Sequence, residues 1–146
     1  MRKIKFRIWD KTDKKMYYSP GITGLHSWFG SFFNESIGDK HAVLMQFTGL
    51  KDKNGKEIYE SDVLELKKPR NNLHPKNQKY LVKWVSEKFD DGEGWYMNGW
   101  KFKRIDNKGG MSTIFDETDI EVIDNIYEGV LKEYENPKLL KEKKNE

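Results

Sequence analysis

The sequence contains no cysteine, and its hydrophobic content is low at 36%. Without cysteine the chain forms no disulfide and no thiolate metal site, which fits the reducing cytosol of a cell. No apolar run approaches the roughly 20 residues that a helix needs to cross a bilayer. The N-terminal segment MRKIKFRIWD is basic and then alternates, without an apolar core or a cleavage site, so we expect no signal peptide. These absences favour a cytoplasmic protein.

Aromatic side chains make up 14% of the chain and compensate for its low hydrophobic content. Because each large ring buries much area, a core of few, bulky side chains is feasible. The length of 146 residues predicts one domain. We expect the domain to span residues 1–140, with a frayed C-terminal tail at 141–146. Pro137 directly follows Asn136 and fits the first position of a short helix near the C-terminus.

The net charge is only +3, but the charges are segregated along the sequence. Residues 67–83 hold six Lys or Arg and no acid, whereas residues 115–128 hold six acids and no base. This segregation either forms two faces of opposite sign or lets the two stretches neutralise each other in the fold. Neutralisation is the preferred interpretation.

Alternating apolar and polar residues predict strands along most of the chain. Residues 3–10 alternate, with Ile4, Phe6 and Ile8 on one face, which predicts a half-buried strand; residues 16–18 predict its return strand.

The central stretch, residues 45–66, predicts two strands closed by a tight turn. Asn54 and Gly55 both tolerate the positive φ that a type I′ hairpin turn needs. Further short strands are predicted at 80–85, 95–105, 113–115 and 119–126. About seven short strands with frequent turn signals predict a mainly β fold, either a small SH3-like barrel or a strongly bent antiparallel sheet.

A short helix is predicted within residues 22–36. Large apolar residues recur there at spacings of three and four, at Leu25, Trp28, Phe29, Phe32 and Phe33. This segment either covers the core or presents an exposed aromatic patch that docks a partner.

Several stretches, in order along the chain, resemble the YopX family of phage and prophage proteins. They are KFRIWDKTDKKMYY near the start, MQFTGLKDKNGKEIYESDV in the middle, VKW at residues 82–84, and EVIDNIYE and ENPKLL near the end. The residues that carry the motifs are Trp9, Asp10, Gly49, Asn54, Gly55, Tyr59, Glu60, Asp62, Asn125, Tyr127 and Glu128. The resemblance implies a phage- or prophage-encoded protein that works inside a bacterial host. It carries over no reaction and no catalytic residue.

The chain departs from the family pattern at three places. It has Ser61 where the family usually has glycine in Tyr-Glu-Gly-Asp, and Asp124 at a second usual glycine. An additional segment separates Glu128 from Asn136. Because glycine supplies positive φ, the motif predicts a turn at position 61, with Asp62 accepting hydrogen bonds from the local backbone. A ligand-binding or catalytic role for Asp62 is the alternative.

The sequence carries no recognisable catalytic, metal or cofactor motif. His26, His41 and His74 lack the spacing of metal ligands, and no glycine-rich phosphate loop precedes a helix. We therefore predict no catalytic residue, no metal and no cofactor. An enzyme that uses two buried carboxylates is the remaining alternative.

The preferred function is a non-enzymatic phage accessory protein, a binding or regulatory module that acts through protein contacts. We expect a homo-oligomer that also binds an unidentified host or phage protein, without membrane contact. The alternative is a nucleic-acid-binding β-barrel whose rings stack on bases and whose cations follow phosphates. The candidate binding residues are Trp28, Phe29, Phe32, Lys67, Lys68, Arg70 and Lys76. The nucleic-acid alternative adds Trp9, Tyr80, Trp84, Trp95, Trp100, Lys101, Lys103 and Arg104.

Overall fold

The computed structural model describes residues 3–19, 42–69, 75–88, 96–106, 111–112 and 119–129. These ranges form two antiparallel sheets, with strand orders β2-β1-β3-β4 and β8-β7-β6-β5-β9. The strands are β1 (Phe6–Asp10), β2 (Lys15–Tyr18), β3 (Ala42–Lys51), β4 (Glu57–Tyr59), β5 (Asp62–Leu66), β6 (Lys79–Lys88), β7 (Tyr96–Arg104), β8 (Met111–Ser112) and β9 (Ile120–Asn125). The predicted mainly β fold class is confirmed.

The first sheet is built on the N-terminal hairpin that the alternating residues predict. β1 pairs with β2, which sets Trp9 opposite Met16, and with β3 on its other side. Asp10 begins the turn, and its Oδ1 accepts hydrogen bonds from the backbone N–H groups of Thr12 at 2.8 Å and Asp13 at 3.0 Å. This is an Asx turn, in which the side chain replaces a backbone acceptor.

β1 is buried on both faces, so the predicted half-buried strand is wrong. Arg7, Ile8 and Trp9 are consecutive, and all three are buried. Successive side chains on a strand point to opposite faces, so both faces of β1 are covered. The alternation of charged and apolar residues suggested a solvent face, whereas Arg7 lies inside the protein.

The turn between β3 and β4 differs from the predicted type I′ turn. Gly55 has a φ of 79°, but Asn54 is outside the positive-φ region. The N–H of Gly55 donates to the carbonyl oxygen of Asp52 at 2.9 Å, and Asp52 Oδ1 accepts from the N–H groups of Asn54 and Lys56. Asp52 and Lys56 pair across the turn, which leaves a three-residue loop that ends in the left-handed Gly55, and such loops are among the next commonest hairpin connections after two-residue turns. The Asp52 carboxylate stabilises this longer loop.

The chain passes from the first sheet to the second at Glu60 and Ser61. β4 ends at Tyr59 and β5 begins at Asp62. The central stretch was predicted to have one strand after its turn, but the structure has two there, which belong to different sheets. β5 then lies between β6 and β9. The N–H of Ser61 donates to the carbonyl oxygen of Val82 at 3.0 Å, at the point where the chain meets β6.

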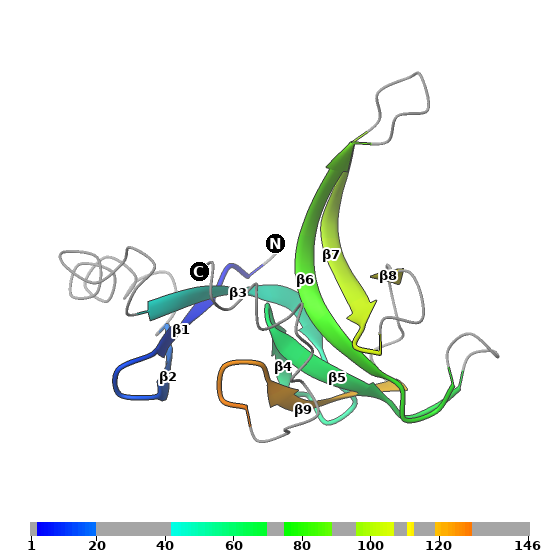
Figure 1. The fold of residues 1–146 in the computed structure, drawn as a ribbon, viewed down its shortest axis with the longest axis horizontal. Helices are drawn as coiled ribbons and strands as arrows, with labels where there is room; N and C mark the ends of the chain where they lie inside the picture. The colour runs from blue at the N-terminus through cyan, green and yellow to red at the C-terminus, as the bar shows by residue number, and fades with distance from the viewer. Residues whose placement is uncertain are drawn as a thin grey trace.

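The β3–β4 turn also contacts β9 and joins the two sheets. The N–H of Lys53 donates to the carbonyl oxygen of Ile120 at 3.0 Å, and Asp52 Oδ2 accepts from the N–H of Val122 at 3.0 Å. The tip of the first sheet therefore meets the outer edge of the second, and the strands curl into a half-barrel (Figure 1). Of the two predicted architectures, the strongly bent antiparallel sheet is the one observed.

The hydrophobic core lies on both faces of β5. Val63 and Leu64 are neighbours on this strand and both are fully buried. On one face Val63 packs with Leu81, and Ile105, Ile123 and Ile126 cover that pair. The larger cluster, on the other face, contains Ile58, Leu64, Leu66, Tyr80, Val82, Phe102, Ile120 and Val122.

Both predicted helices, near residues 22–36 and at the C-terminus, lie outside the described residues. So do the predicted tail at 141–146 and the strand predicted at 113–115. The described ranges contain no α-helix, and none of their residues forms a helix that would span a membrane.

Candidate functional site

The family motifs meet in space around the Asp62 carboxylate. Asp62 Oδ1 lies 2.5 Å from Arg7 Nη2 and 3.3 Å from Asn125 Nδ2, and Oδ2 accepts the N–H of Tyr59 at 2.8 Å. The side chains of Arg7 and Asp62 are only 4% and 1% exposed. A buried ion pair needs this number of hydrogen bonds, because both charges have lost their water. We call these residues and Ser61 the junction.

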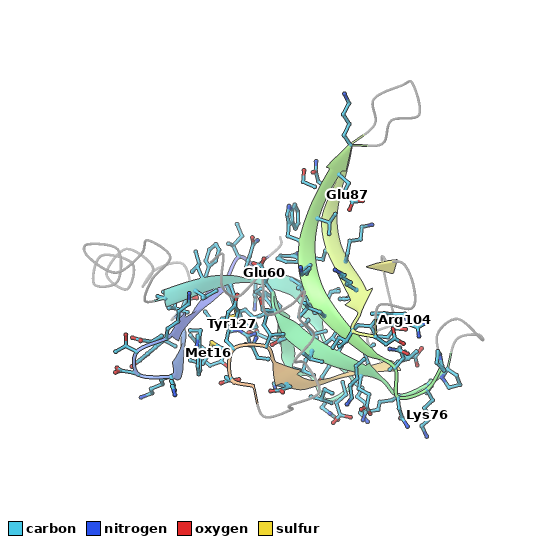
Figure 2. The ribbon with its side chains drawn as sticks, in the orientation of Figure 1. Met16, Glu60, Lys76, Glu87, Arg104 and Tyr127 are labelled. Carbon is cyan, nitrogen blue, oxygen red and sulfur yellow. The ribbon has the colours of Figure 1, made fainter. Side chains whose placement is uncertain are left out.

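Asn125 ties the C-terminal motif to the junction. Its Nδ2 donates to the carbonyl oxygen of Ser61 at 3.0 Å, and its Oδ1 accepts from the N–H of Tyr127 at 3.0 Å. The N–H of Ile126 also donates to the carbonyl oxygen of Ser61 at 3.1 Å. Two motifs that are about 60 residues apart in the sequence thus form one hydrogen-bonded unit. Figure 2 shows Glu60 and Tyr127 in this central region.

Ser61 adopts the conformation that the family's glycine implies. Its φ is 67°, which lies in the left-handed region that side chains with a Cβ avoid. The turn is needed because β4 and β5 belong to different sheets. Gly49 also has positive φ, at 91°, within β3.

Tyr59 covers the guanidinium of Arg7. Arg7 Cζ lies 4.6 Å from the centre of the Tyr59 ring, and the ring also contacts Phe47 and Tyr18. The Tyr59 hydroxyl donates to Glu57 Oε2 at 2.9 Å. Burial, together with the neighbouring Glu57 carboxylate, raises the pKa of Tyr59. The hydroxyl therefore stays protonated and serves as a hydrogen-bond donor.

The junction has the properties of a structural site. Burial raises the pKa of Asp62, and the charge of Arg7 and the three hydrogen bonds oppose this rise. The carboxylate is out of contact with solvent, and its two oxygens already accept bonds from three residues. A general base must reach its substrate directly or through one water. This geometry therefore supports the turn-forming interpretation of Asp62.

Sequence reasoning missed two of the most important polar side chains, Arg7 and Asp52. Arg7 appeared to belong to a solvent face, and Asp52 appeared to be one of several charges at a hairpin tip. Asp52 stands two residues before Asn54-Gly55, at the first position of the turn. Aspartate is favoured at this position because its carboxylate accepts hydrogen bonds from the N–H groups of the turn, so its role could have been predicted. For Arg7 we find no comparable local signal.

The basic and acidic stretches partly neutralise each other, as the preferred interpretation predicts. Lys67 Nζ lies 2.5 Å from Glu65 and 3.2 Å from Glu121, and Lys68 Nζ lies 3.3 Å from Asp119. β5 pairs with β9, and Lys67 and Lys68 directly follow β5, which brings them close to Glu121 and Asp119 of the acidic stretch. Of the other candidate binding residues, Lys76 is exposed, whereas Trp28, Phe29, Phe32 and Arg70 lie outside the described residues.

The rings named for nucleic-acid binding do not form one surface among the described residues. Tyr80 and Trp9 are buried, while Trp84 is 47% exposed. Among the cations, Lys101 is buried and Arg104 pairs with Asp106 at 2.6 Å. Trp95 lies outside the described ranges.

The outer part of the β6–β7 hairpin projects from the half-barrel (Figure 1). We define the arm as residues 83–88 of β6 and 96–101 of β7, which pair with each other in continuous register. β5 pairs with β6 only up to Leu81, and β8 pairs with β7 only at Phe102 and Lys103. Among the described residues the arm is therefore a two-stranded ribbon. Figure 2 shows Glu87 far along it, away from Glu60 and Tyr127.

A pair of tryptophans continues the core stripe onto the arm. Trp84 and Trp100 are register partners, and their rings meet edge to face at 5.1 Å. They share a strand face with Val82 and Phe102 of the large core cluster, because residues two apart on a strand point the same way. Trp100 packs against that cluster, whereas Trp84 is exposed. The two-stranded arm thus exposes the large ring of Trp84 to solvent.

The described residues contain no group of three or more side chains of the metal-binding types placed to hold an ion. The three histidines lie outside these ranges.

The fold and the junction define a class, a curled antiparallel β protein whose two sheets are joined by a buried ion pair. The family model described as YopX protein matches residues 5–141, nearly the whole chain. The protein belongs to the YopX family.

One solved structure that the chain resembles is that of protein EF1440 from Enterococcus faecalis. The two chains are 24% identical, the match covers 94% of this chain and 97% of that chain, and the TM-score is 0.46. A search of curated proteins found no match.

Proposed function

We propose that this YopX-family protein is a non-enzymatic phage or prophage accessory protein that acts through protein contacts inside a bacterial host cell. It self-associates and also binds a host or phage protein. The observation that carries the proposal is the arm, which holds the exposed Trp84 outside the half-barrel. Tryptophan is enriched among the residues that anchor protein–protein interfaces.

The junction supports a non-enzymatic role. The motif residues at the junction, Tyr59, Asp62 and Asn125, form hydrogen bonds that join the two sheets. The Asp62 carboxylate is buried and hydrogen-bonded. A binding module needs a well-ordered body behind its contact surface, and the hydrogen bonds of the junction join the two sheets of the half-barrel from which the arm projects.

Nucleic-acid binding stays a prediction from the sequence. The support for nucleic-acid binding is weaker because Lys67 and Lys68 pair with acidic side chains and Tyr80 lies in the core. A titration of single-stranded DNA at low salt tests it, since phosphate contacts weaken steeply as salt rises. Binding that disappears with Lys67→Ala and Lys68→Ala would establish this alternative.

The proposed function is tested by sedimentation velocity and by capture of host and phage proteins, with the full chain as bait. The variant is Trp84→Ser, and the matched control is Tyr18→Ser, which removes an exposed ring on β2. We expect Trp84→Ser to weaken self-association and to lose captured proteins, and Tyr18→Ser to behave as the unaltered chain. A chain that is monomeric at all concentrations, with capture unaffected by Trp84→Ser, contradicts the proposal.

A further inference from the structure

The arm has an open strand edge where β5 leaves β6. Backbone groups on an antiparallel strand point alternately to its two neighbours. The carbonyl oxygens of Gln78 and Val82 accept bonds from the β5 side, and that of Lys79 accepts a bond from the β7 side. Even-numbered residues of β6 therefore face away from β7. Beyond Val82 these are Trp84, Ser86 and Lys88, and no described strand pairs with them.

The turn at Ser61 creates this open edge. If β5 continued backward in its register with β6, positions 61 and 60 would lie beside residues 83 and 84. Instead, the positive φ of Ser61 directs the chain away into the first sheet. An isolated two-stranded ribbon is only marginally stable in water, and unpaired strand edges are templates for another strand. The arm is thus suited to accept an extended strand along β6.

We infer that the strand that pairs there is β6 of a second copy of this chain, antiparallel to the first, with Val85 on the two-fold axis. The inference rests on the proposed function and specifies its self-association. In this register Trp84 faces the partner's Ser86, and these residues exchange backbone hydrogen bonds, because both point to the open edge. The result is a continuous sheet in the order β7-β6-β6-β7.

Charge complementarity selects this occupant and this register. With Val85 on the axis, Lys83 of each copy lies opposite Glu87 of the other copy, which gives two opposite-charge pairs. A register centred on Ser86 sets Val85 opposite Glu87, so neither cross-copy pair of Lys83 with Glu87 forms. A register centred between Val85 and Ser86 sets Lys83 opposite Lys88. It also sets each even-numbered residue, which points to the open edge, opposite an odd-numbered residue, which points to β7, so the backbone N–H and C=O groups do not meet.

The β7 edge of the arm is the poorer candidate. β8 already pairs with part of β7, and Gly99 lies in the middle of its outer half. Glycine weakens strand pairing because it has no side chain to pack. An antiparallel self-pairing centred on Gly99 sets Met97 opposite Lys101 and forms no charge pair.

A charge-swap cycle tests the inferred register in the full chain by sedimentation equilibrium. Glu87→Lys or Lys83→Glu alone turns both cross-copy pairs into like-charge pairs, so we expect the dimer dissociation constant to rise on the order of tenfold or more. The double variant Lys83→Glu, Glu87→Lys restores both pairs and is expected to return the constant to near that of the unaltered chain.

Disulfide trapping gives an independent test, because the chain has no cysteine of its own. Directly opposed residues in a pair without backbone hydrogen bonds have Cα atoms about 4.5 Å apart, within disulfide range. Val85→Cys should therefore cross-link into dimers under mild oxidation. Ser86→Cys and Asn98→Cys, which are both on the arm, should not.

The outcomes separate the inference from the proposed function. Cross-linking of Val85→Cys alone, with rescue by the double charge swap, supports the inference. A dimer that Val85→Cys does not trap and that Glu87→Lys leaves unchanged overturns the arm interface, while self-association stands. A monomer at all concentrations overturns both the inferred dimer and the self-association within the proposed function.

Discussion

The junction and the arm differ in almost every feature that stabilises a protein. At the junction, Arg7 and Asp62 are buried and hydrogen-bonded, and segments from four strands meet around them. On the arm, Trp84 is exposed, and among the described strands the two strands of the arm pair only with each other. The comparison teaches that the motif residues placed at the junction maintain the shape of the protein. In the proposed function, the region that has the fewest contacts within the chain is the one that binds another chain.

The largest expected effect comes from removing the buried carboxylate at the junction. Asp62→Ala leaves the Arg7 guanidinium buried without its counter-charge, which we expect to lower the free energy of unfolding by about 3–5 kcal/mol. Urea denaturation followed by circular dichroism measures this loss. The control is Asp106→Ala, which removes the more exposed partner of Arg104 and should cost less than about 1 kcal/mol.

A hydrophobic replacement of the same ion pair sharpens that result. Replacing both members, with Arg7→Met and Asp62→Leu together, removes the uncompensated charge, so much of the stability lost in Asp62→Ala should return. A double variant as unstable as Asp62→Ala would mean that the hydrogen bonds, and not the buried charge, dominate the junction.

The buried carboxylate of Asp52 is expected to have the next largest effect. It accepts the N–H groups of Asn54, Lys56 and Val122, so Asp52→Ala loses bonds within the turn and to β9. We expect a loss of roughly 3 kcal/mol in the same unfolding measurement. Asp10→Ala is the matched control, because Asp10 forms a similar turn at an exposed site. If the two losses are equal, closure of the half-barrel does not depend on Asp52.

The sequence predicted the parts of this molecule that depend on local patterns. The N-terminal hairpin and the β class follow from alternation and from turn residues, whereas the turn at position 61 follows from the family resemblance, which implies a glycine there. The contact of Lys67 with Glu121 follows from charge segregation. The burial of Arg7 does not, since its partner Asp62 lies 55 positions away and no local pattern encodes that pairing. The two-stranded arm was also missed, because an apolar strand has the same pattern whether or not a neighbour covers its edge.

Glycine substitutions at the two positions where the family usually has glycine should have opposite effects. Ser61 has positive φ, so Ser61→Gly relieves strain and should raise the free energy of unfolding by about 0.5–1 kcal/mol. Asp124 is not among the residues with positive φ, so Asp124→Gly gains nothing and should cost a similar amount. Thermal or urea unfolding measures both. A loss of stability in Ser61→Gly would contradict the strain at this turn.

The smallest expected effect is a pH dependence at the edge of the first sheet. Burial alone would raise the pKa of Glu57, but hydrogen bonds from Lys5 and Tyr59 and the charges of Lys5 and Lys51 lower it below 4.5. The ionised carboxylate therefore adds stability above that pH, and this contribution is lost as the pH falls through the lower folded-state pKa. Glu57→Gln should be less stable at pH 7 by under about 1 kcal/mol, with no difference in strong acid. A difference that persists in strong acid would point to packing.

Backbone hydrogen exchange, followed residue by residue at low and high protein concentration, tests the contrast between body and arm most directly. At low concentration the N–H groups of Leu81 and Val63 should exchange slowly, whereas those of Trp84 and Ser86 should exchange fast because they face the open edge of β6. Of these four N–H groups, only those of Trp84 and Ser86 should become better protected at high concentration. Slow exchange of these two groups in the dilute monomer would contradict the account, because the edge of the arm would already be covered.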